Sequence, residues 1–194
     1  WFKSEVALEE FLAMSNIEKS MFISSNFKSP MRRSGRKRAL VCGVGINDAN
    51  YTTAPSINGL CVVCPAYACW RGMIRRSYDK RHLEQYQTYA RVSVCDEWLS
   101  FSAFRGWWLK NYVEDCEIDK DIIGNGKVYS PDGCLFVPAW LNTFTLDARA
   151  SRGEWPIGVC FDKESGKFMA QCRNPITRKN KKLGRFKDPL EAHE

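Results

Sequence analysis

The sequence lacks long apolar runs, has little histidine and contains no second paired-cysteine motif. No stretch approaches the roughly 18 consecutive apolar residues that a helix needs to cross a bilayer, so we expect no membrane partner. The N-terminal segment EVALEEFLAMSNIEKS is acidic and amphipathic, whereas a secretion signal is basic and then apolar. These absences favour a protein of the reducing cytoplasm.

The nine cysteines are expected to be reduced thiols. Cys61-Val-Val-Cys64 has the spacing of half a zinc site, and Cys69 lies nearby. A structural zinc site is tetrahedral, and no second CxxC motif supplies the remaining ligands. We therefore interpret the cysteines as small buried hydrophobic residues.

Positive charge is concentrated in three stretches, against a net charge of +7 for the chain. Residues 32–38 (RRSGRKR) carry five positive charges, residues 71–81 carry five against Asp79, and residues 151–188 carry ten against four acidic residues. Separate basic stretches suit a long anionic ligand such as a nucleic-acid duplex. A generally basic surface without such a partner is the alternative.

We expect a mixed α+β fold in four parts. Residues 1–30 are an N-terminal extension, extraneous or loosely attached. Residues 31–65 form a basic extended arm with short strands, which would lie along a DNA backbone or act as a plain linker. Residues 66–150 form the main domain, and residues 151–194 form a small β-sheet module.

Two helices are predicted in the main domain from apolar spacing. Residues 66–78 place Trp70, Met73 and Ile74 on one helical face and two arginines on another. A second apolar stripe begins after Trp98 and is expected to be core; it comprises Phe101, Phe104, Trp108 and Tyr112.

A strand, turn, strand and helix are predicted between residues 116 and 150. The strands cover residues 116–122 and 127–137, the second broken at Ser130-Pro-Asp-Gly, and Gly124-Asn-Gly126 is the turn. Pro138 is expected in the first turn of the helix. The expected packing face of that helix is Trp140, Leu141 and Phe144.

This order places an acidic residue, Asp119, on the first strand and an amide, Asn142, on the helix. Carboxylate and amide oxygens suit a hard cation, and phosphodiester hydrolysis needs a metal and a base. The sequence predicts one divalent ion, Mg²⁺ or Mn²⁺, between Asp119 and Asn142. Asp121 either joins that metal or faces solvent.

The C-terminal module is predicted to contain three short strands, at residues 157–161, 167–172 and 181–186. Residues 162–166 form a turn between the first two. Asp188 is expected to cap a following helix with Pro189 in its first position.

Residues 38–148 resemble phage HNH endonucleases. The resemblance is carried by Trp70…Met73…Arg76-Ser-Tyr78, Val94-Cys95-Asp-Glu-Trp98 and Ile118-Asp119-Lys120-Asp121…Gly-Asn-Gly-Lys-Val-Tyr129-Ser-Pro131…Asn142. It implies a ββα-metal unit that cleaves or nicks duplex DNA in a homing-like way, encoded by a bacteriophage and acting in the host cytoplasm. It also implies that Asp119 and Asn142 hold the metal.

Lys120 departs from the family, whose better-studied members carry a histidine there. Lys120, Asp119 and Asn142 are nevertheless the predicted catalytic residues. Because a lysine side chain is protonated near neutral pH, Lys120 could act as the base only if burial and the neighbouring metal lowered its pKa. The alternative is that Lys120 holds a phosphate electrostatically while another group or bulk water supplies the base. His82 is the other interior candidate, on a polar stretch. Two alternatives to a nuclease follow: a catalytically inactive DNA-binding regulator, and a phage protein that binds and inhibits a host defence factor.

Residues 153–193 resemble the plant Apetala-type DNA-binding domain. The resemblance is carried by Gly158-Val159, Gly166-Lys167-Phe168-Met-Ala170 and Leu183-Gly184-Arg185-Phe186. It implies a three-stranded sheet in the major groove with a helix behind it. We expect a monomer without a small-molecule substrate. The nucleic-acid-binding candidates from all basic stretches are Arg36, Lys37, Arg38, Arg71, Arg75, Arg76, Arg152, Lys163, Lys167, Arg173, Lys182 and Arg185.

Overall fold

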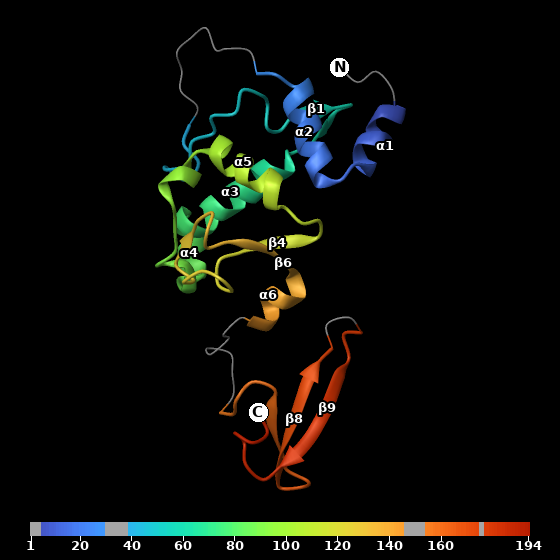
Figure 1. The fold of residues 1–194 in the computed structure, drawn as a ribbon, viewed down its shortest axis with the longest axis vertical. Helices are drawn as coiled ribbons and strands as arrows, with labels where there is room; N and C mark the ends of the chain where they lie inside the picture. The colour runs from blue at the N-terminus through green and yellow to red at the C-terminus, as the bar shows by residue number, and fades with distance from the viewer. Residues whose placement is uncertain (1–4, 30–38, 146–153, 175–176) are drawn as a thin grey trace. The chain divides into compact units, whose positions relative to one another are not determined.

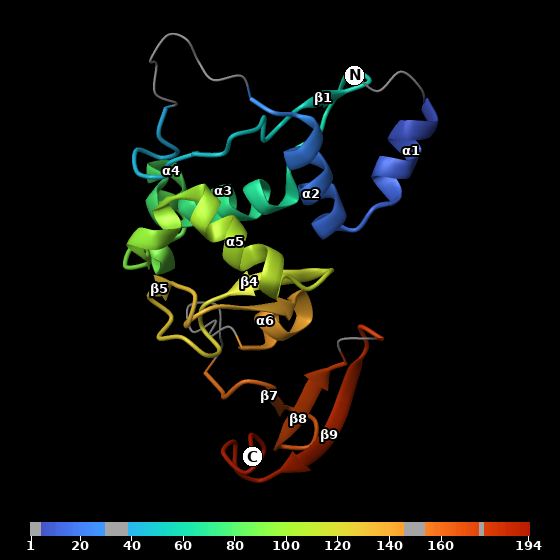
Figure 2. The ribbon, with the colours of Figure 1, turned by 45° about the horizontal axis from the view of Figure 1, so that its top comes forward.

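The computed structural model describes residues 5–29, 39–145, 154–174 and 177–194, and the α+β prediction is confirmed (Figure 1, Figure 2). The chain divides into two compact units, Trp1–Asn142 and Thr143–Glu194. The sequence analysis had expected the division near residue 150. In the described part of the chain, no helix has both the length and the apolar character to cross a membrane.

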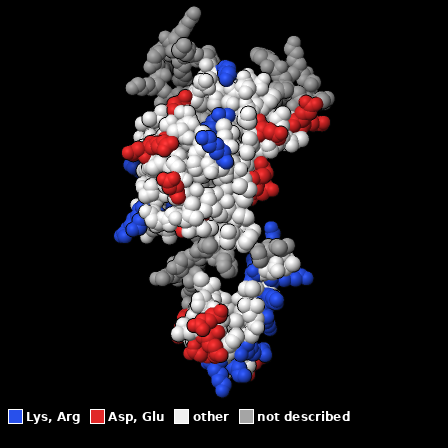
Figure 3. All heavy atoms as spheres, in the orientation of Figure 1, with Lys and Arg blue, Asp and Glu red and all other residues white. Residues whose placement is uncertain are grey.

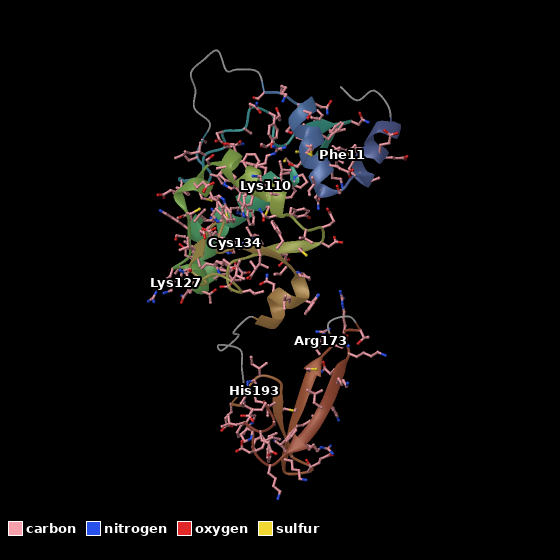
Figure 4. All side chains as sticks on the ribbon, in the orientation of Figure 1. Phe11, Lys110, Lys127, Cys134, Arg173 and His193 are labelled. Carbon is pink, nitrogen blue, oxygen red and sulfur yellow. The ribbon has the colours of Figure 1, made fainter. Side chains whose placement is uncertain are left out.

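The N-terminal helices are an integral part of the first unit. Helices α1 (Glu5–Ala13) and α2 (Asn16–Asn26) contribute Phe11 and Ile23, which are buried in the core. Figure 4 labels Phe11 of α1 between the two helices. The expected loose attachment is therefore wrong for residues 5–29, because their apolar side chains are needed to complete the core.

The start of α2 is fixed both locally and by a distant segment. Ser15 and Glu18 form a capping box, in which each side chain bonds the other residue's backbone N–H. Asn16 Nδ2 donates to Glu114 Oε1 at 2.6 Å and to the Tyr112 hydroxyl at 2.8 Å. These contacts tie the N-terminal helices to Tyr112 and Glu114, far along the chain.

The predicted arm also contributes to the core over its described part. The short strands β1 (Ser56–Ile57) and β2 (Leu60–Cys61) form an antiparallel hairpin. Tyr51, Ile57 and Cys64 are buried. The expectation of short strands is confirmed, but residues 39–64 are not a free arm, because they cover the central helices.

The two predicted core helices are confirmed as α3 (Pro65–Tyr78) and α5 (Phe101–Asn111). Their side chains at Trp70, Met73, Ile74, Phe101, Phe104 and Trp108 are fully buried. Trp70 Nε1 donates to the Trp98 carbonyl at 2.7 Å. The connecting segment holds the short helices α4 (Lys80–Gln85), η1 (Gln87–Tyr89) and η2 (Asp96–Leu99).

The second predicted strand of the main domain is divided between two sheets. β4 (Cys116–Asp119) pairs antiparallel with β6 (Leu135–Pro138). β5 (Val128–Tyr129) instead pairs parallel with β3 (Ser93–Val94). The turn at residues 130–133 allows the chain to leave one sheet and enter the other.

Helix α6 (Ala139–Thr145) follows β6 directly. Pro138 ends β6 and lies one residue before the helix, where the prediction had placed it in the first turn. Trp140 is 51% exposed, so it is not part of a packing face as expected. Residues 146–150 and the side chain of Phe144 lie outside the described part of the structure.

The second unit confirms the three predicted strands. β7 (Val159–Asp162), β8 (Lys167–Arg173) and β9 (Asn180–Phe186) form an antiparallel sheet in that order. Asp188 accepts hydrogen bonds from the N–H groups of Leu190 and Glu191, as a cap does. The predicted helix after it does not form, because the segment makes only isolated turns.

Candidate nucleic-acid interface and metal site

One face of the C-terminal sheet is basic. Directly paired residues in a sheet project to the same side, and residues two apart on a strand share a face. Met169 pairs with Arg185, and Gln171 pairs with Lys182. The candidates that share this face are Lys167, Arg173, Lys182 and Arg185, all of them exposed.

A register shift in the sheet brings Lys182 onto this face. The irregularity lies between Ala170 and Gln171, where Ala170 pairs with Gly184 and Gln171 pairs with Lys182. Leu183 is thereby skipped, as at a β-bulge. Strict alternation along β9 would have placed Leu183 and Lys181 beside Arg185. Lys181 instead pairs with Cys172 and lies on the opposite face.

The opposite face of the sheet is aromatic. Phe161 and Phe168 are paired, with ring centroids 5.2 Å apart, and Trp155 lies 4.7 Å from Phe168. Ala170 is buried at 5% exposure. In Figure 3 the lysines and arginines of this unit follow the β9 side of the sheet, and Figure 4 shows Arg173 at the end of β8. The aromatic packing of this unit thus lies on the face opposite the four basic candidates.

The remaining C-terminal candidates differ in position. Lys163 is exposed in the turn between β7 and β8. Arg152 lies outside the described residues, as do Arg36, Lys37 and Arg38 of the predicted arm.

Helix α3 separates its three candidate arginines. Arg71 and Arg75 are exposed and lie one helical turn apart, and the Arg71 guanidinium is 5.8 Å from the centroid of the Tyr67 ring. Arg76 points inward, and its Nε donates to the Tyr129 hydroxyl at 3.2 Å. Burial raises the pKa of Tyr129 to about 12, so this hydroxyl stays neutral. Arg71 and Arg75 are therefore the arginines of α3 that a ligand can reach.

A cluster of oxygen-bearing side chains lies on one face of β4. Ile118 pairs with Phe136, whose ring stacks on Trp107 of α5 at 5.6 Å. Glu117 and Asp119 alternate with Ile118 and face the other side. Asn142 of α6 reaches this second face, where its Nδ2 donates to Glu117 Oε2 at 3.1 Å.

Glu117 was missed in the sequence analysis. Its spacing of two residues from Asp119 in a predicted strand was the available signal, because such residues share a face. Asp119 itself is buried at 3% exposure, and its Oδ1 accepts from the N–H groups of Asp121 and Ile122 at 2.9 and 2.8 Å. This carboxylate therefore shapes the turn that ends β4.

Lys120 is enclosed rather than presented to solvent. It is 6% exposed, and its Nζ lies 2.9 Å from Asp121 Oδ1. The same ammonium lies 5.5 Å from the Tyr89 ring centroid and 5.7 Å from the Tyr129 ring centroid. A buried ammonium requires such compensation. The Lys120 ammonium is thus paired with the Asp121 carboxylate.

The loop between β4 and β6 is tightly packed at Gly124. A Cβ atom at Gly124 would collide with the carbonyl oxygen of Lys120 and lie 2.6 Å from that of Gly133. Asn125 accepts a hydrogen bond from Lys127 N at 2.9 Å, which fits the predicted turn. A shallow depression of about 460 Å³ opens here, lined by Ile123, Gly124, Asn125, Val128, Ser130, Asp132 and Gly133.

The donor set suits magnesium chemistry. Mg²⁺ is commonly held by one or two carboxylates and completed by water and a substrate phosphate; Glu117, Asp119 and the Asn142 amide offer such oxygens. Among the described residues there is no group of three or more His, Cys, Asp or Glu that could hold a metal ion.

His82, the other interior candidate of the sequence analysis, is packed against Tyr86 and Tyr89, at 4.7 and 5.5 Å between ring centroids.

No protein-family model, curated protein or solved structure matches the chain. The resemblances to HNH endonucleases and Apetala-type domains therefore stay predictions, and the function must be argued from the residues themselves.

Proposed function

We propose that the protein binds double-stranded DNA through the basic face of its C-terminal sheet. The observation that carries this proposal is the gathering of four exposed basic side chains, Lys167, Arg173, Lys182 and Arg185, on one side of β8 and β9. β-strands can enter a DNA groove. Lysine and arginine contacts to phosphates then supply affinity by releasing counterions.

The test is the salt dependence of binding to a short duplex, measured by fluorescence anisotropy between about 50 and 200 mM salt. Affinity should fall by several factors of ten, and Lys182→Ala should reduce the log–log slope by about 0.9. Lys181→Ala is the matched control, since Lys181 is the adjacent lysine on the other face. Weak binding with little salt slope would instead favour an acidic protein partner, such as a host defence factor.

A second candidate function, metal-dependent cleavage of DNA, is favoured by the contact between Glu117 and Asn142 beside Asp119. These three residues would hold a Mg²⁺ or Mn²⁺ ion. Such an ion supplies positive charge at the scissile phosphate and lowers the pKa of bound water. Glu117 and Asp119 of β4 and Asn142 of α6 would position the ion. Lys120 is paired with Asp121 and is not assigned as the base in this proposal.

Nicking of supercoiled plasmid with Mg²⁺ or Mn²⁺ tests the second candidate. Glu117→Gln and Asn142→Ala should abolish cleavage while duplex binding is retained. Asp119→Asn should also abolish cleavage, because it removes a charged ligand. The turn after β4 should remain intact, since the amide oxygen can still accept the two backbone hydrogen bonds. Asp132→Asn is the control, because Asp132 is an exposed acidic residue in the loop between β4 and β6 and is not one of the three proposed ligands. A wild-type protein that binds duplex and cuts nothing would be a non-catalytic DNA-binding protein.

A further inference from the structure

An acidic side chain lies among the basic residues of the proposed DNA-binding face. Asp162 at the end of β7 pairs with Lys167, and Arg185 of β9 pairs with Met169, so both side chains lie on that face. Asp162 Oδ2 is 3.0 Å from Arg185 Nε. The ion pair therefore spans the central strand of the sheet.

The Asp162 carboxylate is fixed by the turn that it begins. The Ser165 hydroxyl donates to Oδ2 at 2.9 Å, and the Glu164 N–H donates to Oδ1 at 3.2 Å. Gly166 N bonds the Asp162 carbonyl at 2.8 Å, and Gly166 takes the positive φ of 65° that closes the turn. Hydrogen bonding from Ser165, with a smaller contribution from Arg185, lowers the pKa of Asp162, so it is charged at neutral pH.

Arg185 is held at one edge of its guanidinium and stays accessible elsewhere. Its side chain is 53% exposed, whereas that of Asp162 is 15% exposed. The ion pair uses Nε, while an arginine bonds the O6 and N7 atoms of guanine through a two-pronged contact. An ion pair this exposed stabilises the fold little. Its main physical effect is to restrict where the guanidinium points.

Two roles of Asp162 in DNA binding predict different effects of removing it. A carboxylate on a DNA-binding face repels phosphates, so on charge alone its removal would strengthen binding to every duplex. If Asp162 instead holds Arg185 for a base contact, its removal would loosen sequence preference. The two expectations can be separated experimentally.

We propose that Arg185 contacts a guanine in the major groove and that Asp162 is the positioning residue that orients it. The inference rests on the proposed DNA binding and adds the base class that the sheet recognises. Because Asp162 already restricts the Arg185 guanidinium, the side chain loses less rotamer freedom when it binds a base.

The experiment begins with selection of preferred duplexes from a random pool by the full chain. Each guanine of the selected site is then replaced by 7-deazaguanine, which lacks the N7 acceptor. At one guanine the replacement should weaken wild-type binding on the order of 10-fold. Arg185→Met, which has no hydrogen-bond donor, and Asp162→Asn should remove most of that penalty at this position alone, and Asp162→Glu should restore part of it.

Lys182→Ala is the control, because loss of a phosphate contact weakens binding to all duplexes alike and leaves the 7-deazaguanine penalty unchanged. Thermal unfolding of each variant checks that the sheet is intact. An unchanged penalty in Arg185→Met overturns the base contact, and tighter binding by Asp162→Asn with an unchanged penalty overturns the positioning role. In both cases DNA binding itself stands. A wild-type protein that binds no duplex at low salt overturns the proposed function and this inference together.

Discussion

Asn142 of α6 and Glu117 of β4, separated by 25 residues, are joined by a hydrogen bond of 3.1 Å between Nδ2 and Oε2. The contact brings the amide of the helix to the face of β4 that also carries Asp119. The strand contributes two carboxylates to this face and the helix adds an amide, so residues far apart in the sequence share one cluster.

Glu117→Gln should weaken Mn²⁺ binding by about tenfold or more, since it replaces a charged ligand by a neutral one. Titration calorimetry of the whole chain with MnCl₂ measures this directly, without any need for DNA cleavage. Asp132→Asn should bind Mn²⁺ like the wild type. Equal affinities for wild type and Glu117→Gln would place any metal elsewhere.

Gly124→Ala should destabilise the first unit by about 1–3 kcal/mol, because the added methyl group would overlap two backbone carbonyl oxygens that cannot both move. Urea unfolding followed by tryptophan fluorescence measures the loss. Gly106→Ala is the matched control: its Cβ would meet nothing within 4 Å, and it lies inside α5, where alanine is favoured. Equal effects of the two substitutions would contradict the packing argument.

Asp48→Asn should lower stability by about 1 kcal/mol or less, because Asp48 caps α5 from outside the helix. Its Oδ1 accepts from Ser102 N at 2.8 Å, and its Oδ2 accepts from the Ser100 hydroxyl at 2.7 Å. Denaturant unfolding gives the difference, with the exposed Asp96→Asn as control.

The same capping contact has a pH signature. Burial of Asp48 alone would raise its pKa, but hydrogen bonds from Ser102 and Ser100 outweigh burial and hold it below the ordinary 3.8. A lowered carboxyl pKa stabilises the fold above the unfolded pKa, and this contribution is lost as pH falls through the folded pKa. The difference between wild type and Asp48→Asn should therefore be constant from about pH 7 to 5 and shrink below about pH 4.

Asp121→Asn should cost more stability than Lys120→Met. The first change leaves the Lys120 side chain, which is 8% exposed, without its carboxylate partner. We expect this to cost about 1–3 kcal/mol after allowance for the half-exposed Asp121. The second removes the charge and keeps an apolar chain of similar length between Tyr89 and Tyr129. Thermal unfolding ranks the variants; the reverse order would contradict this account.

Lys120→Met should also leave duplex affinity within about twofold of wild type, because an enclosed lysine contributes little to counterion release. A large loss of affinity would mean that Lys120 reaches the phosphates after all, as the sequence analysis had allowed.

The sequence by itself determined the elements whose side chains repeat locally. Trp70, Met73 and Ile74 lie at helical spacing, and they form the buried face of α3. The three C-terminal strands were predicted because short β-prone runs are separated by turn residues such as Gly166. Local periodicity suffices here, since each pattern fits only one backbone geometry on which its apolar residues share a face.

Only the tertiary structure decided which segments meet. β5 leaves its predicted strand to pair with β3, and Arg76 turns inward while Arg75 stays exposed. The skipped residue Leu183 brings Lys182 to the basic face. Strand register, partner choice and side-chain burial depend on free energies summed over segments far apart in the chain. The spacing of residues within one element therefore cannot predict which strands pair, in which register, or which side chains are buried.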